Sequence, residues 1–474
     1  MAEKTPADVT VSGQGTVQEE WKPRRQEYLI MITMSLISLM VALDTSILTP
    51  CLPTMASALH GTANDAFWAG TSYLLTSSIF QPFLAALSDI FGRQQLLFTA
   101  ILLFLIGSIL AAVAQGFPLL LAGRNIVPLR QRLIYASFVQ VSWALGIITV
   151  GLVMVPLVVR LKLPESSLLQ KFWGVDWMGG ALFIGSTTSL LLGITWGGVE
   201  YPWASVALTM LWEWKGPKKP FLRLSIFKGR SAASIYLCAI AQGLILYGDI
   251  YYVPFYLEVV KGYSPILTGV GLMPITVGII PTTILISGLV AKLGRYRWAI
   301  WSGWLVTIIG TALMIVLDVD TLTYQWVLCL FVLGLGHGMI LSILTYAIQV
   351  VTSNSDGPYA VAMYTSIRTF GMCLGVAVGG TALQNLLSKY LGEVGLPTDI
   401  AQNAEGYAQI LLRLPKELEY RAKVVAVYAK AFRGVFEIIT GISAVGGLAG
   451  LFIERYSMNR SLDSEYVLMR ENLE

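Results

Sequence analysis

Two acidic residues lie inside long apolar runs of this sequence, and they are the first candidates for chemistry. Asp44 falls late in the run 28–50, and Asp249 lies in the middle of the run 231–256. An ionisable group inside a membrane span is costly and marks a functional site by default. Asp44 is therefore expected either to bind and release a proton or to act as a structural acid near the outer end of its helix.

Tyrosines surround Asp249 in the sequence and suggest a second kind of chemistry. Tyr247, Tyr251 and Tyr252 lie within three positions of the acid. A carboxylate among aromatic rings suits an apolar, often cationic guest, through charge pairing and cation–π contact. These four residues are the predicted substrate pocket, and the alternative interpretation is a solvated or interfacial acid.

A third cluster follows the run 67–87. Asp89 and Arg93 flank Gly92, which permits a tight turn between two helices. An acid and a base at neighbouring helix ends can pair and hold one face of a bundle closed. These residues are the predicted gating loop, and the alternative is a loop whose basic residue only orients the chain.

The elements that position these residues must be membrane helices. Hydrophobic residues make up 55% of the 474 positions and charged residues only 13%, about half the share in soluble domains (roughly 25%). A bilayer span needs about 20 apolar residues. We predict eleven full spans, at 28–50, 67–87, 95–115, 133–159, 177–196, 231–256, 266–291, 297–317, 326–350, 361–387 and 432–453, and two stretches too short to cross unaided, at 118–127 and 203–214.

Basic residues in short loops predict the orientation of the chain. We expect a cytosolic tail (1–27), an N-terminal bundle (28–214), a basic cytosolic linker (215–230), a C-terminal bundle (231–454) with a partly helical extracellular loop (388–431), and a cytosolic tail (455–474). The linker is cytosolic only if the short stretch 203–214 crosses a locally thinned bilayer. The alternative is an inverted C-terminal half.

Several short motifs together resemble the 14-span drug:proton antiporter branch of the major facilitator superfamily, and within it fungal multidrug and toxin exporters. The motifs are the loop 88–93, Leu43–Ile47 with Leu52-Pro53, Asp176–Gly179, Leu190–Gly198, Lys261–Pro265, Gly294–Arg297 and Arg368–Gly371. The resemblance implies an all-α polytopic bundle with a midplane substrate site and alternating access. It also implies that Arg124, which resembles a fourth-span arginine, takes part in proton coupling with Asp44.

The sequence departs from this family in its first half. Val127-Pro128-Leu129-Arg130 follows Arg124 almost at once and resembles the loop after the fourth span, so that span is expected to be missing. The run 133–159 resembles the start of the fifth span joined to the end of the sixth, and 203–214 resembles a truncated eighth span. A shortened, inactive or mis-spliced exporter is therefore one expectation.

Other classes of protein lack their sequence signals here. There are two histidines, four scattered cysteines, and no G-x-x-x-x-G-K-[ST], G-x-S-x-G or H-E-x-x-H motif. We expect no enzyme, metal or cofactor, no nucleic-acid binding and no obligate protein partner. The expected partners are the lipid bilayer, protons and a small hydrophobic organic substrate. The predicted function is proton-coupled export across the plasma membrane, with a vacuolar or other internal membrane as the alternative location. An importer of the same fold, for example for siderophores, is the alternative function.

Overall fold

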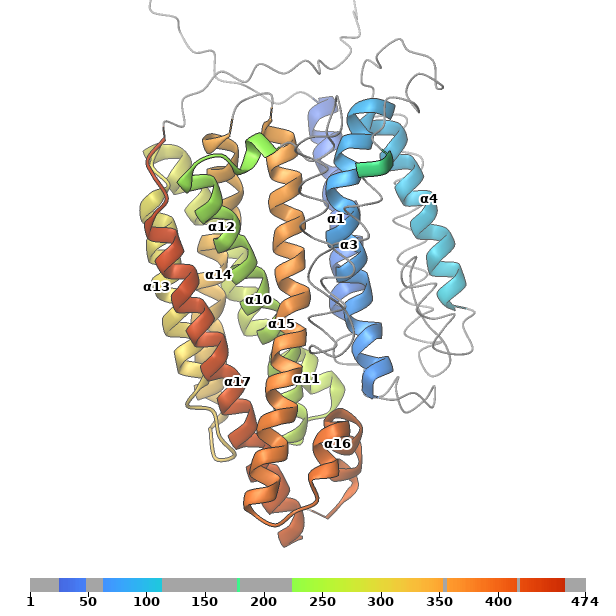
Figure 1. Ribbon diagram of the computed structural model, residues 1–474, viewed down its shortest axis with the longest axis vertical. Helices are drawn as coiled ribbons and strands as arrows, with labels where there is room; N and C mark the ends of the chain where they lie inside the picture. Colours follow the sequence, from blue (N-terminus) through green and yellow to red (C-terminus); the bar gives the residue numbers. More distant parts are fainter. Residues whose placement is uncertain are drawn as a thin grey trace, which may run out of the picture.

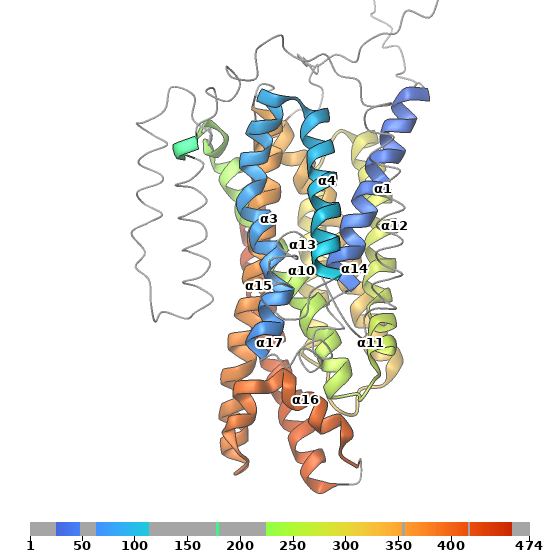
Figure 2. The same ribbon diagram turned by 90° about the vertical axis from the view of Figure 1, so that its right-hand side faces the viewer.

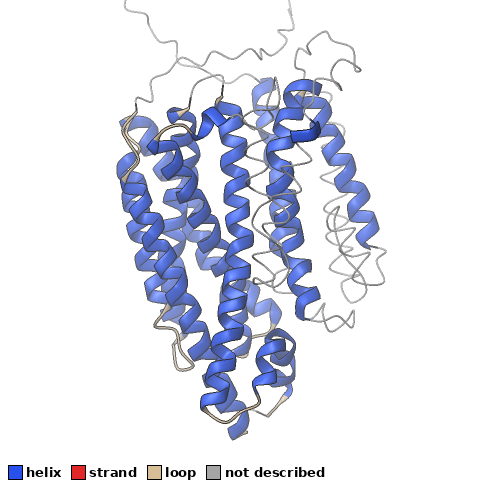
Figure 3. Cartoon of the chain, in the orientation of Figure 1, coloured by secondary structure: helices blue, strands red, loops and turns tan. Residues whose placement is uncertain are grey.

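The computed structural model describes residues 25–47, 63–112, 177–179, 224–352, 356–415 and 418–456. Within these ranges all the regular structure is helical, as Figure 3 shows. A helix satisfies its backbone hydrogen bonds internally, which lipid cannot do for it. Five helices in these ranges are long and apolar enough to cross a membrane. The predicted all-α membrane bundle is therefore confirmed.

Three described helices come from the N-terminal half. They are α1 (Arg25–Ile47), α3 (Ala63–Phe91) and α4 (Arg93–Ala112), and they match the first three predicted spans. They stand together beside the C-terminal bundle in Figures 1 and 2. Helix α3 packs along α15, where the hydroxyl of Ser366 donates a hydrogen bond to the carbonyl oxygen of Ser78.

The C-terminal half forms a bundle of long, nearly parallel helices (Figure 1). Its elements are α10 (Arg230–Val259), α11 (Pro265–Gly271), α12 (Met273–Leu293), α13 (Arg297–Met314), α14 (Thr323–Val351), α15 (Gly357–Glu393) and α17 (Glu419–Leu451). The predicted span 266–291 is divided between α11 and α12. Pro274 lies in the first turn of α12 and has no N–H to continue the α11 hydrogen-bond ladder.

Glycines bring the helix backbones of this bundle into close contact. A Cβ atom on Gly371 or Gly375 of α15 would overlap backbone atoms of α10, and a Cβ on Gly278 of α12 would lie 2.8 Å from the carbonyl oxygen of Phe331. Small residues permit such approaches, which drive helix association in lipid by van der Waals packing.

The helices of the C-terminal half are closed at one end by a short helical cap. Its elements are the 3₁₀ helix η3 (Thr398–Asn403) and α16 (Ala404–Arg413), which lie between α15 and α17 at the bottom of Figure 1. Tyr428 of α17 donates a hydrogen bond to the carbonyl oxygen of Ala404 (2.8 Å), and Arg421 donates one to that of Leu414 (2.8 Å). The segment predicted as a partly helical loop is thus mostly helical.

The opposite end of the bundle carries a second group of basic residues, separate from those near the cap, such as Lys389, Arg421 and Lys423. The α12–α13 turn and the start of α10 lie at the same end as the α3–α4 turn (Figures 1 and 2). Basic residues near this end are Lys228, Arg230, Lys292, Arg295 and Arg297. Four predicted stretches lie outside the described residues: the spans 133–159 and 177–196, and the short stretches 118–127 and 203–214. Of these, only residues 177–179 are described.

Candidate functional site

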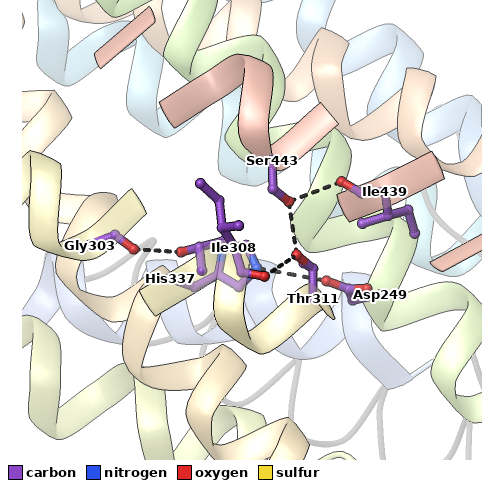
Figure 4. Close-up of polar contacts among 8 residues, drawn as sticks. Asp249, Gly303, Ile308, Thr311, His337, Ile439 and Ser443 are labelled. Carbon is purple, nitrogen blue, oxygen red and sulfur yellow. Dashed lines mark hydrogen bonds and ion pairs between the residues drawn. The ribbon is translucent and has the colours of Figure 1, made fainter. Parts of the chain in front are cut away.

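Four helices of the C-terminal half each contribute one polar side chain to the interior of the bundle. These residues are Asp249 of α10, Thr311 of α13, His337 of α14 and Ser443 of α17, and none is more than 1% exposed. Figure 4 shows them converging between the four helices. We call this set the polar core. Most buried polar groups in proteins have a hydrogen-bond partner.

The two hydroxyl groups of the polar core have partners. Thr311 and Ser443 lie 3.2 Å apart, oxygen to oxygen, and link α13 to α17. Ser443 also donates to the carbonyl oxygen of Ile439 (2.9 Å), and Thr311 donates to that of Ile308 (3.1 Å). These contacts, drawn in Figure 4, give both hydroxyls hydrogen-bond partners within the protein, so neither needs a ligand as a partner.

The acid and the imidazole of the polar core are close but not hydrogen-bonded. The distance from His337 Nε2 to Asp249 Oδ2 is 3.9 Å, beyond the range of a hydrogen bond. In the described part of the chain, neither carboxylate oxygen and neither ring nitrogen has a hydrogen-bond partner. Unpaired polar atoms at this depth are costly. Gln242 of α10 is also buried without a hydrogen-bond partner, but Asp249 and His337 are two ionisable groups without one that face each other.

The tyrosines predicted to line a substrate pocket with Asp249 lie on the same helix in different settings. Tyr252 is 1% exposed and donates a hydrogen bond to the carbonyl oxygen of Val376 (2.6 Å), so it joins α10 to α15. Tyr251 is also buried and packs edge-to-face on Tyr252, with ring centroids 5.1 Å apart. Tyr247 is half-buried.

An apolar cavity lies elsewhere on the C-terminal half. It holds about 670 Å³ between α11, α12 and the start of α14, and its walls are almost entirely apolar. Met273, Trp326 and Phe331 are among its lining residues, and none of the polar-core residues is. The cavity therefore offers an apolar surface but no charged group.

The predicted gating loop forms the turn between α3 and α4. Gly92 has φ of 98°, in the left-handed region that favours glycine, and its N–H donates to the carbonyl oxygen of Ser88 (3.0 Å). The predicted tight turn is therefore present. Asp89 lies in the last turn of α3 and Arg93 begins α4, but their side chains lie outside the described part of the chain.

The side chains of the two predicted proton-coupling residues lie outside the described part of the chain. Asp44 lies in the last turn of α1, and its side chain is not described. Arg124 lies outside the described residues.

Sequence reasoning missed His337 as a partner of Asp249. The histidine lies between Gly336 and Gly338 in an apolar run and gives no motif of its own. The available signal was its rarity, since an intramembrane histidine is a functional candidate by the same argument as an intramembrane acid.

The fold and sequence place this protein in a known family. Residues 34–380 match the profile of the Major Facilitator Superfamily, and the chain belongs to it. Among solved structures, one neighbour is a bacterial homologue of the human lysosomal transporter Spinster in an inward-facing, unoccupied conformation. Its TM-score is 0.56 at 15% identity, over 90% of this chain and 97% of that one.

Fungal transporters are among its relatives. MFS transporter L2 of Phoma sp. is 34% identical, over 94% of this chain and 85% of its own length. Efflux pump FUS6 of Gibberella moniliformis is 25% identical over 96% and 92%, and the MFS-type efflux pump LUC4 of Fusarium sp. is 25% identical over 93% and 90%. The protein is thus a multi-pass membrane transporter of this superfamily and not an enzyme.

The relatives carry internal residues that this chain lacks. The alignment with the Phoma transporter runs over 509 positions, whereas 94% of 474 residues is about 446. The difference of about 63 positions has no counterpart here, and it equals roughly three spans of 20 residues. The sequence predicts that this loss falls in spans four to six and eight.

Proposed function

We propose that this protein exports hydrophobic small molecules in exchange for protons. The observation that carries the proposal is the carboxylate of Asp249, buried in the middle of α10 with no hydrogen-bond partner in the described part of the chain. An acid at this depth is expected to be functional in a membrane transporter. The relatives named efflux pumps support export as the direction.

A proton gradient is the energy source that the sequence favours. It contains no phosphate-binding G-x-x-x-x-G-K-[ST] loop through which ATP could act. In the superfamily architecture, two halves rock around a midplane site, and a proton bound to a buried acid stabilises one of the two states. Substrate release and proton uptake then alternate at the outer face.

The remaining sequence-based assignments enter this proposal as roles to be tested. Asp44 and Arg124 are the N-terminal proton-coupling candidates, and the loop at Asp89, Gly92 and Arg93 is the candidate cytosolic gate. We place the end of the bundle with the α3–α4 and α12–α13 turns in the cytosol, because Arg93 and Arg295 lie at these short turns and the positive-inside rule applies to short loops. The cap of η3 and α16 then faces outward, and we assign the protein to the plasma membrane.

The test is compound accumulation in yeast cells that lack their own major exporters. Cells expressing the fluorescently tagged protein are loaded with a panel of fluorescent hydrophobic cations and acids, with and without a protonophore. We expect lower accumulation than in vector controls, and loss of that difference when the protonophore is added. An Asp320→Asn variant serves as a control, because Asp320 is an exposed acid between α13 and α14.

The other outcomes identify the rival functions. Higher accumulation than in the vector control means an importer of the same fold. The proposal is contradicted if the protein is well expressed and correctly localised but the accumulation of every compound in the panel equals that of the vector control. That outcome favours an inactive, shortened exporter. The roughly 63 positions absent from the chain are the specific reason to test that rival.

A further inference from the structure

We propose that Asp249 and His337 together form a proton-binding site within the C-terminal half, and that loading this site with an extra proton opens the packing of α10 against α14. The inference rests on the proposed function and deepens it, because it moves the proton site away from Asp44 and Arg124. The ligand is the proton, and water accompanies it.

The number of protons on the pair decides its net charge. With one proton the pair is neutral overall, either as carboxylic acid beside imidazole or as carboxylate beside imidazolium. With two protons it carries one positive charge, and with none it carries one negative charge. An uncompensated charge cannot remain in a dry interior without a large desolvation penalty. The closed geometry, with both side chains 1% exposed, therefore favours the one-proton pair.

A second proton changes this balance. It leaves a carboxylic acid beside an imidazolium whose charge has no counterion, so water must enter to solvate it. Entry of water requires α10 and α14 to separate. Proton loading and opening of the bundle are thus linked, which is the coupling that a proton-driven transporter needs.

The geometry holds the imidazole in place for this role. His337 lies between two glycines of α14 that make backbone contacts on different neighbours. A Cβ on Gly338 would lie 2.6 Å from the carbonyl oxygen of Ile279 in α12, and one on Gly336 would overlap Thr307 of α13. The backbone of His337 is therefore fixed by α12 and α13. The 3.9 Å separation from Asp249 leaves the pair able to close to hydrogen-bond distance by side-chain rotation.

No other described carboxylate or cation pairs with either residue. The helices packed against them carry these titratable or charged side chains: Arg230, Tyr236, Cys238, Tyr247, Tyr251, Tyr252, Tyr256 and Glu258 on α10; Lys292 on α12; Arg297 on α13; Tyr324, Cys329 and Tyr346 on α14; Tyr359, Tyr364, Arg368, Cys373, Lys389, Tyr390 and Glu393 on α15; and Glu419, Tyr420, Arg421, Lys423, Tyr428, Lys430, Arg433 and Glu437 on α17. On α17, Arg433 pairs with Glu437 at 3.7 Å on the exposed surface.

Arg368 lies on the part of α15 that packs against α10. Its backbone carbonyl group lies against Gly243, six positions before Asp249, or about 9 Å along α10.

The first experiment measures protonation without requiring transport. Difference infrared spectra of the purified full-length protein in lipid are recorded between about pH 8 and pH 5, the range in which histidine titrates. We expect a band from a carboxylic acid to change in the wild type, and this change to be absent in Asp249→Asn and shifted in His337→Gln. The same band change in wild type and Asp249→Asn overturns the proposal. Because no substrate is needed, this result stands even if export itself is not found.

The second experiment asks whether the pair couples protons to flux. Proteoliposomes are assayed for flux driven by a pH gradient and for exchange of labelled substrate without a gradient, using a compound identified by the accumulation assay. We expect Asp249→Asn and His337→Gln to lose at least about tenfold of the gradient-driven flux while retaining exchange within about twofold.

Control variants distinguish coupling from damage to the fold. Thr311→Val removes a neighbouring hydroxyl that does not titrate and should retain gradient-driven flux, as should Asp320→Asn. The exchanged double variant, with Asp249→His and His337→Asp, keeps both partners and should recover part of the flux lost by the single variants. Gradient-driven flux in Asp249→Asn within about twofold of wild type, or an equal loss in Thr311→Val, overturns the proposal.

Discussion

Replacement of Gly310 by alanine tests how tightly α13 and α14 are packed. Gly310 lies on the face of α13 that meets α14 around Leu333. A Cβ added there would lie 2.7 Å from the Cα atom of Leu333, 2.9 Å from its backbone nitrogen and 3.1 Å from its Cβ. The first two are backbone atoms, so no side-chain rotation can relieve the overlap.

The size of the effect follows from these distances. Carbon atoms in contact prefer a separation of about 3.5–4.0 Å, so the two helices must move apart by roughly 1 Å. Overpacking of this kind costs about 1–3 kcal/mol. Alanine regains up to about 1 kcal/mol of helix propensity over glycine, so we expect a net loss of about 1–2 kcal/mol.

The measurement is the melting temperature of the purified protein in detergent, followed by size-exclusion fluorescence. Gly288→Ala in α12 is the matched control, because no atom lies within 4 Å of its added Cβ. We expect Gly310→Ala to melt several degrees below wild type and Gly288→Ala to melt at or above it. Equal melting temperatures for the two variants would refute the claim that close glycine packing joins α13 to α14.

Three further predictions concern other parts of the molecule. Tyr252→Phe removes the 2.6 Å hydrogen bond to Val376 and should cost about 1 kcal/mol, measured as a lower melting temperature. Gly92→Ala places a side chain at φ of 98° and should lower the melting temperature by the equivalent of about 1–2 kcal/mol, whereas a melting temperature equal to that of wild type would argue against the turn described here. In the cap, burial and the neighbouring hydroxyl of Tyr420 raise the pKa of Tyr407 to about 12. The protonated phenol is thus favoured by folding below about pH 10, and that contribution is lost as the pH rises toward 12. Ultraviolet titration of wild type against Tyr407→Phe should therefore reveal one phenol that ionises late.

The polar core also suggests how a transporter with a shortened first half could retain function. All four of its residues lie in helices of the C-terminal half, and their contacts involve only that half. The proposed proton site therefore does not depend on the stretch around Arg124. Whether the whole chain transports is decided by the accumulation assay, and the infrared titration tests the site separately.

The sequence by itself determined the features that depend on neighbouring residues. Apolar runs of about 20 residues predicted the helices from α1 to α17 where the structure describes them, because burial in lipid depends on local hydropathy and length. The four-residue spacing of Gly371 and Gly375 is likewise a local pattern, and both contact α10 as close packing requires. The turn at Gly92 followed from a single residue type.

Only the tertiary structure decided which distant residues meet. Asp249 and His337 are 88 positions apart on different helices, and hydropathy gives no information about which faces of two apolar helices are opposed. The sequence suggested that Asp249 would face tyrosines, since they are its neighbours along the chain. The packing of α10 between α14, α15 and α17 instead turns Tyr252 toward Val376 and the carboxylate toward His337, because in a bundle the helix rotation is set by contacts with all its neighbours together.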